Sequence, residues 1–209
     1  MFKIPFSLVF ILSMILLSTG CSDSGSDSSE PSVNAAQGDA YERAYSPSMG
    51  PESAKVTIVE FFDPACEACR AFYPLVKQIM ERHPEDVRVV LRYATFHEGS
   101  DTVVRMLEAA RLQDVFVPVL EGLLKAQPEW ASHHAPNIDR AWEVAKASGL
   151  NIAQAEMVMN SAEFDQRLTQ ETADIRELKI SQTPTFFVNK KPLTDFGGQQ
   201  LYDLVVSEL

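Results

Sequence analysis

Residues 56–70 read VTIVEFFDPACEACR. The first half is an apolar, β-branched run of the length of a buried strand, and a short turn containing Pro64 follows it. Two cysteines, Cys66 and Cys69, then stand at the start of an amphipathic helical pattern. Because a helix N-terminus carries partial positive charge and unpaired N–H groups, it favours a thiolate there. This arrangement suits a centre for thiol–disulfide exchange.

The flanking sequence predicts an α/β fold. Residues 55–62 read as a central strand that is buried on both faces, and residues 87–94 read as a second strand. The helix between them contains Pro74, which is expected to kink it after its first turn. A β-α-β order implies parallel strands joined by a right-handed crossover. The expected apolar face of this helix consists of Phe72, Leu75, Val76, Ile79 and Met80.

The pattern is helical from about residue 101 to residue 179. Asp139 and Ser161 are expected to cap helix N-termini, and Gly149 a helix C-terminus. The helices predicted within the later part of this stretch cover residues 138–148, 152–160 and 162–179.

Strand character returns at residues 185–188. A turn is expected at Lys190 and Lys191, followed by a short edge strand at Pro192 and Leu193. A last helix is expected over residues 199–208.

Residues 1–20 predict a signal peptide, because an apolar core that is too short to span a bilayer follows Lys3. The sequence LSTGC at residues 17–21 resembles a bacterial lipoprotein signal, in which Cys21 becomes the lipidated first residue. Cleavage after Gly20 by an ordinary signal peptidase is the alternative. Residues 21–40 are rich in Ser, Asp and Gly and predict a disordered tether. The folded domain is expected over residues 41–209.

Composition and cysteine usage narrow the function further. The net charge is −11 and Lys and Arg form no cluster, which argues against a nucleic-acid partner. The chain has three cysteines. If Cys21 carries lipid, only Cys66 and Cys69 are left in the domain. A purely structural disulfide between them would close a very short loop and add little stability. No metal or other cofactor is expected.

Three features together resemble the DsbA family of exported thiol–disulfide oxidoreductases. They are Cys66-x-x-Cys69 after a strand, Thr183-Pro184 before a late strand, and the helical stretch between these motifs. The resemblance covers about residues 54–209. It implies a thioredoxin-like fold with an inserted all-helical block at about 101–179.

The resemblance also implies a function and partners. The expected activity is protein-disulfide exchange in the periplasm or cell envelope. The expected partners are exported proteins with thiols or disulfides, a redox protein that recycles the cysteine pair and, through lipid on Cys21, a membrane. The domain is expected to be a monomer.

Site roles follow from the same resemblance. Cys66 is expected to be the nucleophile and Cys69 the resolving thiol. Glu60 would have a raised pKa in its buried strand and would move a proton to or from the buried thiol, unless it reaches solvent at the strand end. Pro184 is expected to be cis and to face the disulfide, with the Thr183 backbone pairing with an extended substrate. An ordinary trans proline is the alternative.

The dipeptide Glu67-Ala68 departs from the Pro-His pair of the best-known family members. Ala68 has no side-chain donor, and Glu67 adds negative charge, which Arg70 would offset in part. We therefore expect a higher Cys66 pKa than in the strong oxidants. We also expect a reduction potential more negative than the roughly −120 mV of DsbA.

Several observations leave alternatives open. His97 follows the second strand, so it either borders the exchange site or packs under the helical insertion. Trp130, His133 and His134 are interpreted as loop surface or as a contact for a partner, because two adjacent histidines are too few for a metal site. The second functional hypothesis is a copper chaperone that uses Cys66 and Cys69 as soft ligands. A cis Pro184 against the cysteines would hinder such metal binding.

Overall fold

The structure is a computed structural model that describes residues 38–209. The predicted signal peptide, Cys21 and most of the tether lie outside the described residues. The fold already includes Gly38, which forms a β-bridge with Arg43, and Ala40, which is buried. Ordered structure therefore begins before the predicted domain start at residue 41.

A five-stranded sheet forms the centre of these residues, in the order β1-β3-β2-β4-β5. The two long central strands, β2 and β3, are parallel, as predicted, and the other pairings are antiparallel. β1 is a two-residue edge strand without a sequence signal. The strands are β1 (Ser48–Met49), β2 (Val56–Phe62), β3 (Val87–Tyr93), β4 (Thr185–Val188) and β5 (Lys191–Pro192).

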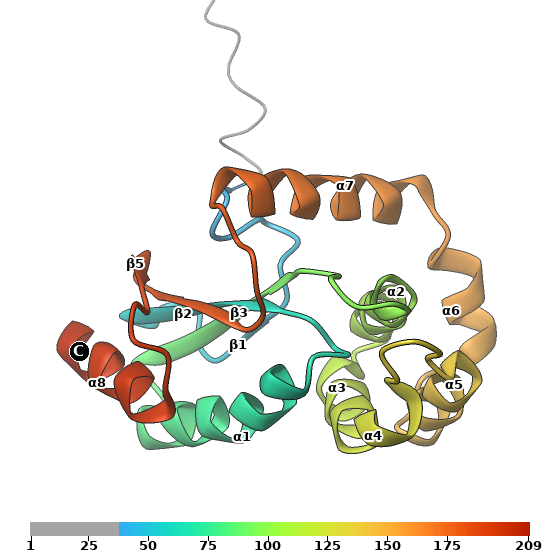
Figure 1. Cartoon of the computed structure of the whole chain (residues 1–209), viewed down its shortest axis with the longest axis horizontal. Helices are drawn as coiled ribbons and strands as arrows, with labels where there is room; N and C mark the ends of the chain where they lie inside the picture. The colour runs from blue at the N-terminus through green and yellow to red at the C-terminus, as the bar shows by residue number, and fades with distance from the viewer. Residues whose placement is uncertain (1–37) are drawn as a thin grey trace, which may run out of the picture. The chain divides into compact units, whose positions relative to one another are not determined.

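Helices cover both faces of the sheet. α1 (Glu67–Arg82) and α8 (Gly198–Glu208) pack on one face, while α7 (Ala162–Glu177) and the segment before β1 lie on the other (Figure 1). The other helices form a block beyond the carboxyl ends of β2 and β3, beside the start of α1 (Figure 1). They are α2 (Ser100–Leu112), α3 (Phe116–Lys125), α4 (Gln127–Trp130), α5 (Ile138–Ala147) and α6 (Ile152–Val158).

The predicted helical insertion therefore divides into two parts that pack in different places. α2 to α6 make the block, but α7, its last helix, packs on the sheet. α7 covers a small apolar cluster that includes Phe61, Val90 and Phe187. The thioredoxin-like α/β class and the inserted helices are confirmed.

Strand β2 shows why its sequence is apolar on both sides. Successive side chains of a strand point to opposite faces. Val56, Ile58 and Phe62 join the main core under α1 and α8, whereas Val59 and Phe61 join the cluster under α7. Glu60 has the parity of Ile58 and Phe62. Its carboxyl group therefore points to the face that carries α1 and the two cysteines.

Helix α1 buries most of its predicted face. Val76 and Ile79 are buried, Phe72 and Met80 pack against the core, and Leu75 is 37% exposed. Cys69 and Tyr73 are buried as well, so the buried stripe extends to the cysteine side of the helix. α1 runs as one helix through Pro74, from Glu67 to Arg82.

The predicted helix ends are partly correct. Ser161 caps α7, with its hydroxyl oxygen 3.4 Å from the Phe164 nitrogen. Asp139 lies inside the first turn of α5 instead, because Asn137 is the cap and accepts from the Arg140 nitrogen at 3.0 Å. At the other end of α5, Ser148 is the cap and Gly149 follows it with a positive φ of 108°.

The predicted turn before the edge strand is shifted by one residue. Asn189 and Lys190 have the positive φ angles, and Lys191 already belongs to β5.

Candidate active site at the start of helix α1

Cys66 stands at the junction of the sheet, the helical block and the loop before β4. It is the N-cap residue of α1, with extended backbone angles, and its backbone nitrogen donates to the Asp63 carbonyl oxygen at 3.1 Å. Its thiol donates to the Thr183 carbonyl oxygen at 3.2 Å. Both Cys66 and Cys69 are free thiols, so the structure represents the dithiol form.

The two thiols have opposite pKa shifts. A hydrogen bond from the Cys69 thiol, together with the backbone N–H groups of Ala68 and Cys69, lowers the pKa of Cys66 to about 5. Burial raises the pKa of Cys69 well above that of an ordinary thiol, and its bond to Cys66 and the charge of Glu60 raise it further. At neutral pH these shifts favour the thiolate form of Cys66, in which the thiol no longer donates to Thr183, and they keep the proton on Cys69.

Glu60 lies beneath this pair in β2. Its residue is 1% exposed, so the carboxyl group does not reach solvent. In the described structure its Oε1 atom has no hydrogen-bond partner. Burial, with a smaller contribution from the charge of Cys66, raises the pKa of Glu60 to about 8. A carboxyl with this pKa can take up or release a proton near neutral pH.

The Thr183–Pro184 peptide bond is cis, as predicted. Pro184 is buried, and β4 begins at the next residue, Thr185. The loop presents the Thr183 carbonyl oxygen to Cys66. The structure therefore brings Cys66, Cys69, Glu60 and Thr183 to one place, although they come from distant parts of the sequence.

Asp63 is a site residue that the sequence analysis did not single out. It is fully buried, and Oδ1 accepts from the Ala65 nitrogen at 2.8 Å and from the Ser100 hydroxyl. Oδ2 accepts from the backbone nitrogens of Phe96 and His97 at 2.8 and 3.0 Å. An Asp at the start of a turn is a sequence signal for backbone bonding. Its bonds to the loop after β3 are visible only in the fold.

Gln127 of α4 also fastens the cysteine loop. Its side chain is buried, and Nε2 donates to the carbonyl oxygens of Pro64 and Cys66 at 2.8 and 3.0 Å. These partners are more than sixty residues away in the chain, so no local pattern marks Gln127. The helical block thus holds the turn from which Cys66 projects.

Two of the histidines contact residues beside the cysteines. His97 Nδ1 is 2.8 Å from Asp63 Oδ2, so His97 borders the cysteine site. His133 Nε2 is 2.9 Å from Glu67 Oε1. The interpretation of Trp130 as loop surface is wrong: its side chain is fully buried and donates to the Leu123 carbonyl oxygen at 2.8 Å. His134 is exposed, as expected.

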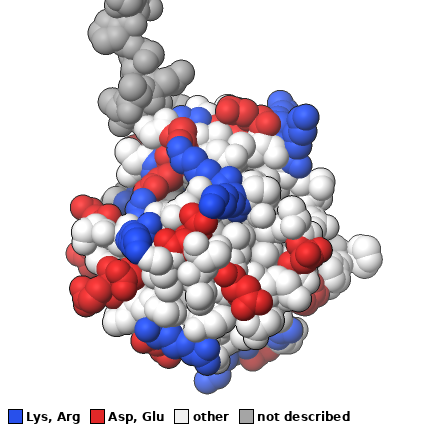
Figure 2. Space-filling view, turned by 90° about the vertical axis from the view of Figure 1, so that its left-hand side faces the viewer, with Lys and Arg blue, Asp and Glu red and all other residues white. Residues whose placement is uncertain are grey.

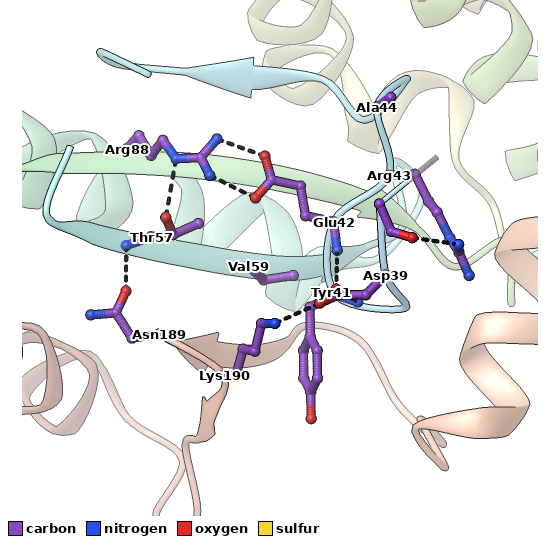
Figure 3. Close-up of a pocket in the computed structure, with 11 residues that line it drawn as sticks. Asp39, Tyr41, Glu42, Arg43, Ala44, Thr57, Val59, Arg88, Asn189 and Lys190 are labelled. Carbon is purple, nitrogen blue, oxygen red and sulfur yellow. Dashed lines mark hydrogen bonds and ion pairs between the residues drawn. The ribbon is translucent and has the colours of Figure 1, made fainter. Parts of the chain in front are cut away.

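A surface hollow lies at the opposite end of β2 from the cysteines (Figure 3). The Arg88 guanidinium donates to Glu42 at 2.6 and 2.7 Å and to the Thr57 hydroxyl at 3.0 Å. Lys190 and Asp39 form an ion pair at 2.5 Å. These polar side chains pair with one another, so the hollow is a weaker candidate for a reactive site than the cysteine pair.

The described surface and helices add two observations. On the face shown in Figure 2, acidic and basic side chains are interspersed and form no basic field. Within residues 38–209, no three His, Cys, Asp or Glu residues are grouped so as to hold a metal ion. No helix of that part has the length and apolar character needed to span a membrane.

One curated relative shares 27% identity over 144 residues: the Na(+)/H(+) antiporter NhaA of Herminiimonas arsenicoxydans. The match covers 69% of this chain but only 22% of that protein. The chain thus spans about a fifth of the length of the relative it matches.

Solved structures show the fold more fully. A thioredoxin-like oxidoreductase from Silicibacter pomeroyi DSS-3 is 27% identical, with 80% of this chain and 93% of that one covered and a TM-score of 0.68. The thiol-disulfide exchange protein alpha-DsbA2 from Wolbachia pipientis is 17% identical, with 81% and 90% covered and a TM-score of 0.67. A periplasmic thioredoxin-like protein from Salmonella enterica serovar Typhimurium is 18% identical, with 83% and 93% covered and a TM-score of 0.66.

A protein-family model described as Thioredoxin matches residues 42–200, which is most of the described domain. This match agrees with the sheet order, the cysteine pair at the start of α1 and the cis Thr183–Pro184 bond. The chain therefore belongs to the thioredoxin family, and its structural neighbours include DsbA-like thiol–disulfide exchange proteins, as its motifs predict.

Proposed function

We propose that this chain is a protein thiol–disulfide oxidoreductase that acts on exported proteins. One observation supports this most directly. A thiol of lowered pKa, Cys66, stands at a helix N-terminus against the Thr183 carbonyl, while its neighbour Cys69 is buried and keeps its proton. One ionised attacking thiol and one reserved thiol are what stepwise exchange requires.

In the first step the Cys66 thiolate attacks a disulfide of the substrate. A sulfur–sulfur bond forms between Cys66 and the substrate, the substrate disulfide breaks, and one substrate sulfur leaves as a thiolate. The hydrogen bonds that stabilise the Cys66 thiolate also make Cys66 a good leaving group in the reverse reaction.

In the second step Cys69 resolves the mixed disulfide. Glu60, in its carboxylate form, accepts the Cys69 proton, and the resulting thiolate attacks the Cys66 sulfur. The second substrate thiolate leaves, and the Cys66–Cys69 disulfide remains. Two electrons have then passed from the protein to the substrate. The same steps in reverse oxidise a substrate dithiol, and relative reduction potentials set the direction.

The Thr183 backbone is the proposed substrate contact. Its carbonyl oxygen bonds the free Cys66 thiol at 3.2 Å in this structure. When Cys66 is joined to a substrate sulfur, that oxygen becomes available to an N–H of an extended substrate chain. Main-chain pairing of this kind is compatible with many substrate sequences.

The proposed location is the periplasm or cell envelope, with a lipid anchor on Cys21. The support is the predicted signal and the LSTGC sequence at residues 17–21. A thiol or disulfide protein that recycles the pair, and action as a monomer, are part of the proposal. Fractionation of cells that express the full chain or Cys21→Ser tests the anchor: the wild-type protein is expected with membranes and the variant in the soluble fraction.

Reduction of insulin disulfides in the presence of dithiothreitol tests the activity. We expect turnover by the wild-type chain, none by Cys66→Ser, and an accumulating mixed disulfide with Cys69→Ser. Cys21→Ser is the matched control, since it removes a cysteine outside the domain and should keep full turnover. If the wild-type protein did not accelerate the reaction, the proposed activity would be wrong.

The copper-chaperone hypothesis is less well supported. The Thr183 carbonyl oxygen lies 3.2 Å from the Cys66 sulfur and already bonds the thiol that a soft metal would need. Copper(I) titration of the reduced chain tests this hypothesis directly. Binding of one copper(I) with loss of both free thiols would favour it.

A further inference from the structure

Contacts around Cys66 form a closed ring that includes two histidines. The Cys66 nitrogen donates to the Asp63 carbonyl oxygen at 3.1 Å, and Asp63 Oδ2 bonds His97 Nδ1 at 2.8 Å. The rings of His97 and His133 lie 5.6 Å apart. His133 contacts Glu67 at 2.9 Å, and Glu67 follows Cys66 in the chain. Three separate segments therefore meet beside one cysteine.

The buried negative charge of Asp63 is balanced by His97. Its side chain is fully buried, and its backbone nitrogen donates to the Cys69 sulfur at 3.5 Å. A buried negative charge on the residue whose carbonyl oxygen accepts from the Cys66 nitrogen would by itself disfavour a Cys66 thiolate. Among residues 38–209, His97 is the one cationic side chain paired with Asp63. A protonated His97 therefore balances the carboxylate and leaves the thiolate without a net negative neighbour.

Glu67 has a similar partner. Its carboxylate bonds His133, and the charges of both His133 and His97 lower its pKa after the larger effect of its own backbone N–H. Both side chains of this pair are more than half exposed, so its contribution is small. His133 thus partly offsets the negative charge that Glu67 places next to Cys66.

We propose that His97, held by Asp63, is a positioning residue that stabilises the Cys66 thiolate from the loop after β3. Its positive charge would substitute for a hydrogen-bond donor between the two cysteines, because neither Glu67 nor Ala68 has such a side-chain donor. This inference rests on the proposed exchange function for its purpose, but it is a statement about the charge state of Cys66. It can therefore be tested without any substrate.

The pKa of His97 supports the coupling. Burial alone would lower it, but the bond and charge of Asp63, with the negative charges of Cys66 and Glu67, raise it above the ordinary value. Glu98 is the other charged group on the same loop, and His133 faces the ring from the loop before α5. Since electrostatic coupling is reciprocal, a thiolate that favours imidazolium is equally favoured by it.

The main test measures the ionisation of Cys66 in the full chain that carries Cys21→Ser. Ultraviolet absorbance of the thiolate is followed against pH for the parent, for His97→Gln and for the control His134→Gln. We expect His97→Gln to raise the Cys66 pKa by about 1 unit. At a pH midway between the two values, the thiolate fraction falls about threefold. His134→Gln should match the parent, because His134 is an exposed neighbour outside the ring of contacts.

An unchanged Cys66 pKa in a folded His97→Gln variant would overturn the proposal. If that variant does not fold, the reciprocal measurement decides. The pKa of His97 is then followed by nuclear magnetic resonance in the parent and in Cys66→Ser. We expect a lower His97 pKa in Cys66→Ser, since the neighbouring thiolate is gone, and an equal value would refute the coupling.

The outcome is separable from the proposed function. If insulin reduction fails but His97→Gln raises the Cys66 pKa, the electrostatic role stands and the activity does not. If reduction succeeds and neither measurement shows coupling, the activity stands and the role of His97 is rejected.

Discussion

Glu60 and Asp174 are both buried acids, on opposite faces of the sheet, and their surroundings differ. On the α7 face, Asp174 accepts from Arg43 at 2.6 and 2.9 Å and from Arg92 at 2.5 Å. Burial alone would raise the pKa of Asp174, but these bonds lower it. On the α1 face, no cationic side chain among residues 38–209 pairs with Glu60, and burial raises its pKa to about 8.

This contrast distinguishes a buried acid that holds the fold together, Asp174, from one that is suited to proton transfer, Glu60. Asp174 and Arg92 connect α7 and the segment before β1 to β3. An ion pair of this kind keeps the carboxylate charged and does not exchange protons near neutral pH. Glu60 lies beside two thiols, and its raised pKa of about 8 lets it gain or lose a proton near neutral pH. A buried acid without a counter-charge costs stability, so its presence points to proton transfer.

The largest expected effect comes from breaking the ion cluster on the α7 face. Arg92 also pairs with the buried Glu171 at 3.0 Å. Arg92→Met leaves Glu171 without this cation and Asp174 with Arg43 alone, and should destabilise the fold by about 3–5 kcal/mol. Chemical denaturation measures this. The matched control is Arg88→Met, which removes a more exposed pair with Glu42 and should cost about 0–1 kcal/mol. Equal losses for the two variants would contradict the structural role.

Glu60→Gln is expected to act in the opposite direction on stability. The folded-state pKa of Glu60 is raised, so its favourable contribution is complete below the unfolded value and is lost as pH rises through about 8. The neutral amide avoids this loss and should stabilise the fold by on the order of 3 kcal/mol at pH 7. Denaturation at several pH values should show a gap that grows from pH ~5 to ~8.

The same Glu60→Gln variant should resolve mixed disulfides at least about tenfold more slowly, because the proton acceptor is gone. Glu108→Gln is the control, since Glu108 is also buried but bonds Tyr93 and Arg167. It should destabilise the fold and leave the exchange rate unchanged. If Glu60→Gln were more stable and exchanged disulfides at the parent rate, Glu60 would lower stability without taking part in proton transfer.

A smaller effect is expected at the junction with the helical block. Gln127→Ala removes both side-chain bonds to the cysteine loop and should cost about 1–3 kcal/mol. It should also slow exchange, because the loop that carries Cys66 loses its anchor. Gln113→Ala, which removes bonds to the exposed Asn151 backbone, is the control and should cost less. Thermal unfolding and insulin reduction measured side by side distinguish the two.

The smallest effect is expected in the hollow of Figure 3. Lys190→Met removes an ion pair to Asp39 whose side chains are 61% and 50% exposed, so stability should change by about 0–1 kcal/mol. Insulin reduction should not change. A strong loss of exchange would mean that this distant surface takes part in substrate binding.

Much of the fold follows from local sequence patterns. The parallel strands β2 and β3, strand β4 and most helix limits follow from apolar periodicity, which reflects one chain segment at a time. Errors occur where a second segment decides. Leu75 is apolar and correctly spaced, yet the docking of α1 leaves it exposed. Trp130 lies in a polar sequence but is buried inside the helical block, where it bonds α3.

The site divides in the same way. The sequence by itself determined the cysteine pair and the acid in the buried strand, because each lies in a short motif with its own chemistry, and its resemblance to the DsbA family predicted the cis Thr183–Pro184 bond. Only the tertiary structure decided that Asp63, His97, His133 and Gln127 lie around Cys66, and that Glu60 has no counter-charge in the part of the chain that the structure describes. Those properties depend on distances between segments far apart in the chain, and charges and hydrogen bonds act through space rather than along the sequence.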